Sequence, residues 1–123
     1  MASELTTGVI ARDSATKYVH VDILNKSSDP IKVEVNFINW IKMNSSSIIK
    51  SFPATIPSNS RRAFTVRVVG TSVNHYEITI DTLIDSKCIK DIIANVYASS
   101  DNQWPPFNTI PANCVSHKDL VQR

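Results

Sequence analysis

The stretch Ile31-Lys32-Val33-Glu34-Val35-Asn36-Phe37 decides the fold class of this chain. Apolar residues fall at every second position of the stretch, and polar residues fill the positions between them. Side chains of an extended chain point alternately to opposite faces, so this pattern predicts a strand with one buried face and one wet face. Continued along the chain, the same alternation places Trp40 on the side of Ile38, opposite Phe37.

Seven further segments have the character of strands, and they are separated by turn-forming clusters such as Asn25-Lys26-Ser27-Ser28-Asp29-Pro30. These segments are residues 7–10, 17–24, 48–56, 63–69, 75–82, 91–98 and 108–116. Pro53 interrupts the third of them and predicts an edge strand or a break in the strand, because proline cannot donate to a β-ladder. About eight short strands without a strong helical pattern predict an all-β protein, an antiparallel sandwich or barrel.

Size and charge exclude several classes of protein. The chain has 123 residues, of which 42% are hydrophobic, and a formal net charge of +2, which is ordinary for one soluble domain. The basic residues are scattered, whereas a nucleic-acid binder would concentrate them on one face. No apolar run is long enough to cross a bilayer, and the N-terminus lacks the pattern of a secretion signal. We therefore expect synthesis in the cytosol, and neither a nucleic acid nor a membrane as a partner.

Residues that carry chemistry form no recognisable set. The three histidines, His20, His75 and His117, stand at polar-face positions or strand ends, without the spacing of a zinc site. Only two glycines are present, so a phosphate-cradling loop is excluded, and no Gly-x-Ser-x-Gly elbow occurs. We expect no catalytic residue, no metal ligand and no cofactor, and hence no enzyme.

Cys88 and Cys114 have a spacing that fits no Cys-x-x-Cys motif. Two interpretations remain open. The cysteines are either reduced and partly buried thiols, or they form a disulfide within the chain or between subunits, which within the chain requires neighbouring strands.

Four aromatic residues are candidates for exposed contacts: Tyr18, Trp40, Trp104 and Phe107. Aromatic side chains on a sheet stack on sugars, and they equally hold subunits together. Trp40 could instead belong to the core, and the apolar loop Trp104-Pro105-Pro106-Phe107 could be buried either within its own domain or in an interface. A carbohydrate-binding or adhesion module is therefore an alternative function.

The N-terminal residues 1–12 are expected to form a connector arm ahead of a β-domain at 13–123. The apolar stretch Leu5-Thr6-Thr7-Gly8-Val9-Ile10 can pair with its own sheet or with the sheet edge of another subunit. Strand addition between chains gives head-to-tail polymers when the rotation does not close. Leu5, Thr7, Val9 and Ile10 are therefore candidate residues of a subunit interface.

Several stretches together resemble a family of small all-β proteins from spore-forming Firmicutes. The resemblance is carried by residues spread over most of the chain, although each motif is only modestly specific. They are Thr6-Thr7-Gly8-Val9-Ile10, Val19-His20-Val21-Asp22-Ile23-Leu24-Asn25, Ile31-Lys32-Val33-Glu34-Val35, Tyr76-Glu77-Ile78, Asn95-Val96-Tyr97 and Ser116-His117-Lys118-Asp119-Leu120-Val121.

Some members of that family are similar to subunits of thin spore-surface appendages. The resemblance implies a jelly-roll-like sandwich that passes its N-terminal connector to the next subunit of a fibre. It also implies a spore or cell surface as the location, the chain itself as the main partner, and an anchoring or tip protein as a further one. The disulfide-linked appendage types carry N-terminal cysteines, whereas this chain has none before Cys88, so its assembly would be non-covalent.

Overall fold

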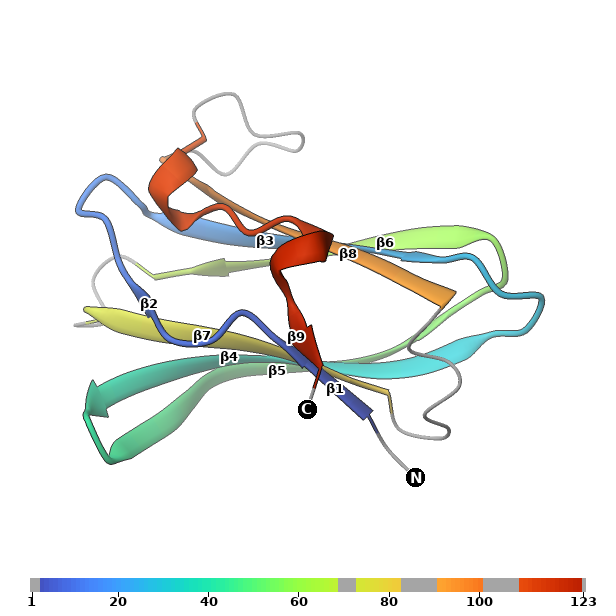
Figure 1. Cartoon of the computed structure of the whole chain (residues 1–123), viewed down its shortest axis with the longest axis horizontal. Helices are drawn as coiled ribbons and strands as arrows, with labels where there is room; N and C mark the ends of the chain where they lie inside the picture. Colours follow the sequence, from blue (N-terminus) through green and yellow to red (C-terminus); the bar gives the residue numbers. More distant parts are fainter. Residues whose placement is uncertain (1–2, 69–72, 83–90, 101–108, 123) are drawn as a thin grey trace.

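The computed structural model describes residues 3–68, 73–82, 91–100 and 109–122, which form an all-β protein of two antiparallel sheets (Figure 1). Within these ranges there is no α-helix, only the short 3-10 turns η2 (Pro111–Asn113) and η3 (His117–Asp119). The larger sheet has the order β5 (Ser45–Ile56), β4 (Ile31–Lys42), β7 (His75–Thr82), β1 (Ser3–Thr6), β9 (Val121–Gln122), and β2 (Ile10–Ala11) also pairs with β7. The smaller sheet has the order β6 (Ser60–Arg67), β3 (Tyr18–Asn25), β8 (Ile92–Ser99).

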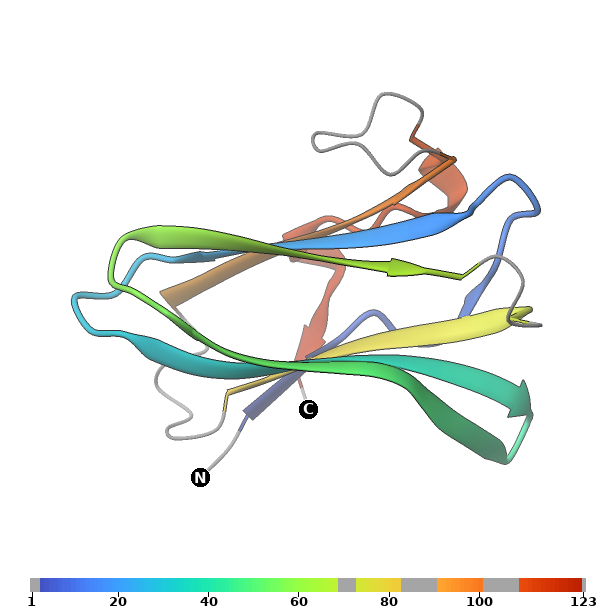
Figure 2. The same cartoon turned by 180° about the vertical axis from the view of Figure 1, so that it is seen from behind.

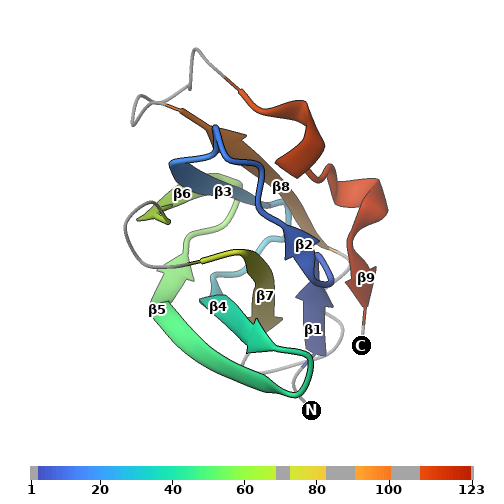
Figure 3. The same cartoon turned by 90° about the vertical axis from the view of Figure 1, so that its left-hand side faces the viewer.

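The two sheets face each other in a sandwich-like arrangement, and their inward side chains form one hydrophobic core (Figure 3). The larger sheet contributes apolar residues of β4 and β7 such as Val35 and Ile80, and the smaller sheet those of β3 such as Val21. The chain passes from one sheet to the other between β5 and β6, where Asn59 takes the left-handed conformation that asparagine tolerates (Figure 2). The predicted all-β antiparallel class is therefore confirmed.

The strands with the clearest alternation lie where the sequence predicts them. β7 has the predicted bounds, and β3, β4, β6 and β8 differ from the predictions by at most a few residues at their ends. β5 is the terminal strand of its sheet, and Pro53 lies within it, so the predicted edge position is confirmed. The period-2 pattern therefore located most of the sandwich.

The last predicted strand, over residues 108–116, is wrong for the part that the structure describes. Pro111 begins the 3-10 turn η2 and interrupts the extended chain. Only two isolated bridges tie the segment to β8, Ser99 with Thr109 and Val96 with Val115. The final strand is instead β9, which follows a second 3-10 turn.

The expected solvent position of His20 is also wrong. His20 is fully buried, although it points away from the core, and hydroxyl groups on both neighbouring strands satisfy its ring nitrogens. Its Nδ1 lies 2.8 Å from Thr65 Oγ1 and its Nε2 lies 2.9 Å from Ser99 Oγ. Alternation assigns a residue to a face correctly, but it cannot show whether that face is covered.

At the N-terminus, the predicted short strand over 7–10 is replaced by two strands. β1 and β2 both pair with β7, and Thr7, Gly8 and Val9 connect them. Leu5 is buried in the core of its own chain. In the single chain, the segment expected to be a connector arm pairs with its own sheet, which is one of the two alternatives that the sequence left open.

Tyr76 is the largest fully buried side chain described, and its hydroxyl has no hydrogen-bond partner among the residues that the structure covers. Burial raises the pKa of the Tyr76 phenol well above its ordinary value. Cys114 adds to this increase of the pKa, and Arg12 opposes it. At alkaline pH, the folded protein therefore keeps this phenol neutral, whereas the unfolded chain would ionise it.

We predict that the unfolding free energy falls by about 1.4 kcal/mol per pH unit above about pH 10, because only the unfolded chain then releases the Tyr76 proton. Tyr76→Phe removes this dependence of the unfolding free energy on pH. Because it also removes an unpartnered buried hydroxyl, it leaves the unfolding free energy at pH 7 unchanged or higher by about 1 kcal/mol. Urea denaturation from pH 7 to 11 measures both effects. Tyr18→Phe, at a half-buried position, is the control, and an equal alkaline slope in wild type and Tyr76→Phe would contradict the prediction.

Candidate interaction site

The candidate site is built around the N-terminal strand. β1 lies inside the larger sheet, with β7 on one side and β9 on the other (Figure 3). It forms four residue pairs with β7, from Ser3 opposite Thr82 to Thr6 opposite Thr79, and two with β9. Leu5 is its one side chain in the core cluster, opposite Ile80. β1 is thus a short strand held mainly by backbone hydrogen bonds and one apolar anchor.

Thr7, Gly8 and Val9 form a kinked link rather than strand. Gly8 has a φ of 70°, which glycine adopts without strain. The Thr7 amide donates to the Ile78 carbonyl at 3.0 Å, and Thr7 Oγ1 accepts from the Ile78 amide at 3.0 Å. The Gly8 amide donates to Thr6 Oγ1 at 2.9 Å. Thr7 therefore binds β7 through one backbone bond and one hydroxyl bond, and the chain turns away from the ladder at Gly8.

A buried carboxylate joins this strand to Trp40. Glu77 lies on the face of β7 that points away from the core, yet it is only 5% exposed. Its carboxylate accepts hydrogen bonds from Thr6 Oγ1 and, at 3.1 Å, from Trp40 Nε1. Buried carboxylates require such donors, so Glu77 fixes the indole of Trp40 beside the N-terminal strand. Trp40 is half-buried on this outer face, which is the predicted side of β4.

The chain is firmly anchored immediately after β2. Asn113 Oδ1 accepts from the Asp13 amide and from Thr16 Oγ1, both at 2.8 Å, and Asn113 Nδ2 donates to the Ala11 carbonyl at 2.9 Å. Arg12 Nε donates to the Thr16 carbonyl at 2.9 Å, and the Arg12 amide donates to the Asn74 carbonyl at 2.8 Å. Residues 11–16 are therefore fixed to the domain by hydrogen bonds that are separate from those that pair β1 with β7.

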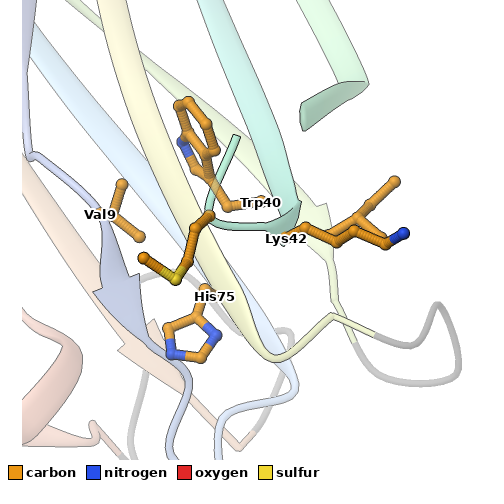
Figure 4. A pocket seen from close by; sticks show the side chains of 6 residues that line it. Val9, Trp40, Lys42 and His75 are labelled. Carbon is orange, nitrogen blue, oxygen red and sulfur yellow. The ribbon is translucent and has the colours of Figure 1, made fainter. Parts of the chain in front are cut away.

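An apolar groove of about 370 Å³ opens beside this link. It is lined by Val9, Trp40, Ile41, Lys42, Met43 and His75. In Figure 4, Val9, Trp40 and His75 border one space, and Lys42 extends away from them. Val9, Ile41 and Met43 are among the most exposed large apolar side chains described, with Met43 fully exposed. The groove is therefore a patch of apolar surface in contact with solvent.

The predicted interface residues of the N-terminus take different positions in the single chain. Thr7 and Ile10 are half-buried, Leu5 is in the core, and Val9 lines the groove with Trp40. Tyr18 does not join them, because it lies half-buried on the other sheet, paired with Arg67. Whether the four N-terminal residues contact a second chain stays a prediction.

Three predicted residues, Cys88, Trp104 and Phe107, lie outside the described residues. Cys114 is described, and its thiol donates to the Ile110 carbonyl at 3.3 Å. The disulfide between Cys88 and Cys114 therefore stays a prediction. No group of three or more potential metal-ligating side chains occurs in the parts of the chain described, and no helix there is long and apolar enough to cross a membrane.

Three residues of the site were missed from the sequence. Glu77 alternates with apolar neighbours and so has the pattern of a wet position, and only the pairing with β1 and β4 shows that it is buried. Asn113 comes two residues after Pro111, within residues 108–116, which the sequence predicted to be a strand. Met43 had a visible signal, because it lies in the hairpin turn between β4 and β5, where polar residues are expected.

Comparison of the chain with protein-family models, curated proteins and solved structures finds no match.

We predict that Asn113→Ala lowers the unfolding free energy by about 2–4 kcal/mol, because it leaves buried donors and an acceptor of residues 11–16 unsatisfied. Urea denaturation at pH 7 measures the change. The matched control is Asn74→Ala, since Asn74 is exposed and contributes its backbone carbonyl to the anchor. Equal stability of Asn113→Ala and wild type would show that the three hydrogen bonds do not hold the anchor.

Proposed function

We propose that this protein is a structural subunit that assembles with copies of itself into a fibre at a spore or cell surface, by non-covalent donation of the N-terminal strand. In this proposal, residues 1–8 of one subunit fill the position of β1 in the next. The chain is not an enzyme and needs no cofactor, and an anchoring or tip protein ends the fibre. We further infer that the sandwich is jelly-roll-like, as the resemblance to appendage subunits implies.

The observation that carries the proposal is the way β1 is attached. Its contacts with β7 and β9 are between strands and do not depend on which chain supplies them. Exchange of an identical element between subunits preserves each contact. The free-energy difference between the chain that keeps its own β1 and the chain that receives β1 from a neighbour is therefore small. Burial of Leu5 contributes about 1.5–3 kcal/mol in either arrangement.

The separate attachment of residues 11–16 supports the same proposal. Asn113 and Arg12 hold residues 11–16, so an exchanging arm would leave the rest of the domain in place. Gly8 supplies a position at which the chain can change direction, because glycine occupies both halves of φ space. The proposed contact of the N-terminal arm is non-covalent, because residues 1–12 contain no cysteine.

Disulfide trapping tests the donation in the full chain. Glu4 and Asp81 are paired residues of β1 and β7, at a Cα separation of about 4.5–5.5 Å that a disulfide can bridge. One chain carries Glu4→Cys and another carries Asp81→Cys, each with Cys88→Ser and Cys114→Ser, and the two are refolded together. We expect a disulfide between chains, and none when Asp81→Cys is replaced by Lys32→Cys on the exposed end of β4.

A lock within one chain provides the second readout. With Glu4→Cys and Asp81→Cys on the same chain, oxidation of the dilute protein closes β1 onto its own β7. We expect filaments of the wild-type protein in electron micrographs, no filaments of the locked protein, and filaments again after reduction. Absence of any product between chains, with dispersed particles at every concentration, would overturn the proposal.

A carbohydrate-binding module is the second candidate function, favoured by the half-buried Trp40 at the edge of the groove. An indole beside polar groups such as His75 is suited to stacking on a sugar. If this is the function, a glycan array shows binding that Trp40→Ala abolishes and that Tyr18→Ala, on the other sheet, retains. Absence of binding to every glycan would remove this candidate.

A further inference from the structure

The two sheets each have a free edge on the same side of the sandwich, which we call the open side. β5 ends the larger sheet and β6 ends the smaller one, and no further described strand pairs with either. Figure 3 shows β5 and β6 together on this side, opposite the C-terminal segment. A free edge presents unpaired backbone amides and carbonyls that can bind a strand of another molecule. With twelve residues, β5 would be a long template for such pairing.

The other edge of each sheet is either covered or very short. Val96 of β8 and Val115 of the C-terminal segment exchange two backbone hydrogen bonds, of 2.8 and 2.9 Å. The Ile110 amide also donates to the Ala98 carbonyl at 2.8 Å. β9, at the other end of the larger sheet, has only two residues, and so short a strand is a poor template for pairing. Among the described strands, the open side is therefore where protection against strand addition is needed.

A cation stands on the core face of each strand of the open side. Lys50 of β5 is paired with the core residue Phe37. Arg62 of β6 is paired with the core residue Ile23. Residues directly opposite each other in a ladder share a face of the sheet. The side chains of Lys50 and Arg62 therefore start from the core face and reach solvent at the open side, where both are exposed.

Each cation lies over an aromatic ring that closes the core at this side. The Lys50 Nζ atom lies 5.8 Å from the centre of the Phe52 ring. The Arg62 Cζ atom lies 5.5 Å from the centre of the Phe64 ring, and the centres of the two rings are 5.5 Å apart. A cation near the face of a ring is attracted by it. Neither cation forms an ion pair with a residue that the structure describes, so no carboxylate accounts for its position.

β5 carries two further interruptions close to Lys50. The register with β4 shifts between Phe37 and Ile38, which leaves Ile49 without a residue opposite it. A bulge of this kind bends the strand and disrupts its pairing. Pro53 has no N–H, and a proline within a sheet directs its nitrogen to solvent, so it removes a donor from the free edge. Bulges, prolines and charges on the core face are means by which natural sheets prevent pairing of their edges.

We infer that Lys50 and Arg62 protect the open side against pairing with an edge strand of a second copy of this chain. A strand added to β5 or β6 would cover the core face beside the cation and remove its charge from water. The edges of a second copy could not compensate for this loss, because neither β5 nor β6 contains an aspartate or a glutamate. The inference is independent of the proposed donation, since it concerns edges that β1 does not occupy.

Self-association of the locked chain tests the inference. The starting protein is the oxidised chain with Glu4→Cys and Asp81→Cys, in which β1 is fixed to its own β7 and cannot be donated. Lys50→Val and Arg62→Val are introduced into it, singly and together, and sedimentation velocity is measured at increasing protein concentration. We expect the starting protein to stay monomeric and the double variant to associate at a concentration about tenfold lower or less, because like charges no longer oppose edge pairing.

Two control variants separate protection by charge from other effects. Lys50→Glu with Arg62→Glu removes both contacts between a cation and a ring but keeps a charge at each position, so it should stay monomeric. Lys26→Val with Lys118→Val lowers the net charge by the same amount at exposed positions outside β5 and β6, and it should also stay monomeric. Urea denaturation of each variant shows that the compared proteins are folded.

Three results would overturn the inference. The first is a double valine variant, together with both single variants, that sediments as the starting protein does at every concentration. The second is association of either control variant to the same extent as the double valine variant. The third is slower hydrogen exchange in the associated protein at strands other than β5 and β6. Because the lock excludes donation, these results leave the proposed function untouched, and the disulfide trap between chains tests that function separately.

Discussion

The structure depends on one requirement, which is that both edges of β7 be paired. β7 is buried over most of its length on both faces, and buried backbone amides and carbonyls must find hydrogen-bond partners. β4 satisfies one edge over seven residue pairs. The other edge is satisfied by the N-terminal residues, through β1, the hydroxyl and amide of Thr7, and β2. The N-terminus is therefore a structural component of the larger sheet.

The second edge of β7 requires a paired strand, and this requirement is met equally by a strand of the same chain or of another. Backbone pairing and the pocket for Leu5 have no means of distinguishing the subunit's own residues from those of an identical neighbour. The distinction is made by the anchor at residues 11–16 and by the length of the link that follows Leu5. Asn113 is central to this arrangement, because its side chain joins the C-terminal segment to Ala11 and Asp13, directly after the N-terminal strands. The hydrogen bonds that hold residues 11–16 and those that pair β1 with β7 are thus made by different residues.

Much of the sandwich could be predicted from the sequence because one-sided burial gives a period of two, as in Ile31 to Phe37. Prediction failed where burial was two-sided or where contacts were made by side chains. His20 and Glu77 occupy polar positions of the alternation, yet hydroxyl and indole partners from distant segments bury them. Among the site residues, Trp40 and Val9 could be named because they are apolar where water is expected. Asn113 could not, since its importance comes from three bonds to a segment about a hundred positions away.

The pairing of β1 with β9 also affects how the two chain ends can be used. Gln122 lies opposite Leu5, so the carboxyl end runs beside the N-terminal strand, and both ends emerge on the same side of the molecule (Figure 1). In a fibre of exchanged strands, every carboxyl terminus would sit at a joint between units. A protein or label fused to the carboxyl terminus would therefore interfere sterically with this joint. The turn at Ser58 and Asn59, where the chain passes from β5 to β6, lies beyond the edge of the larger sheet opposite β9 and offers an attachment point away from the joint.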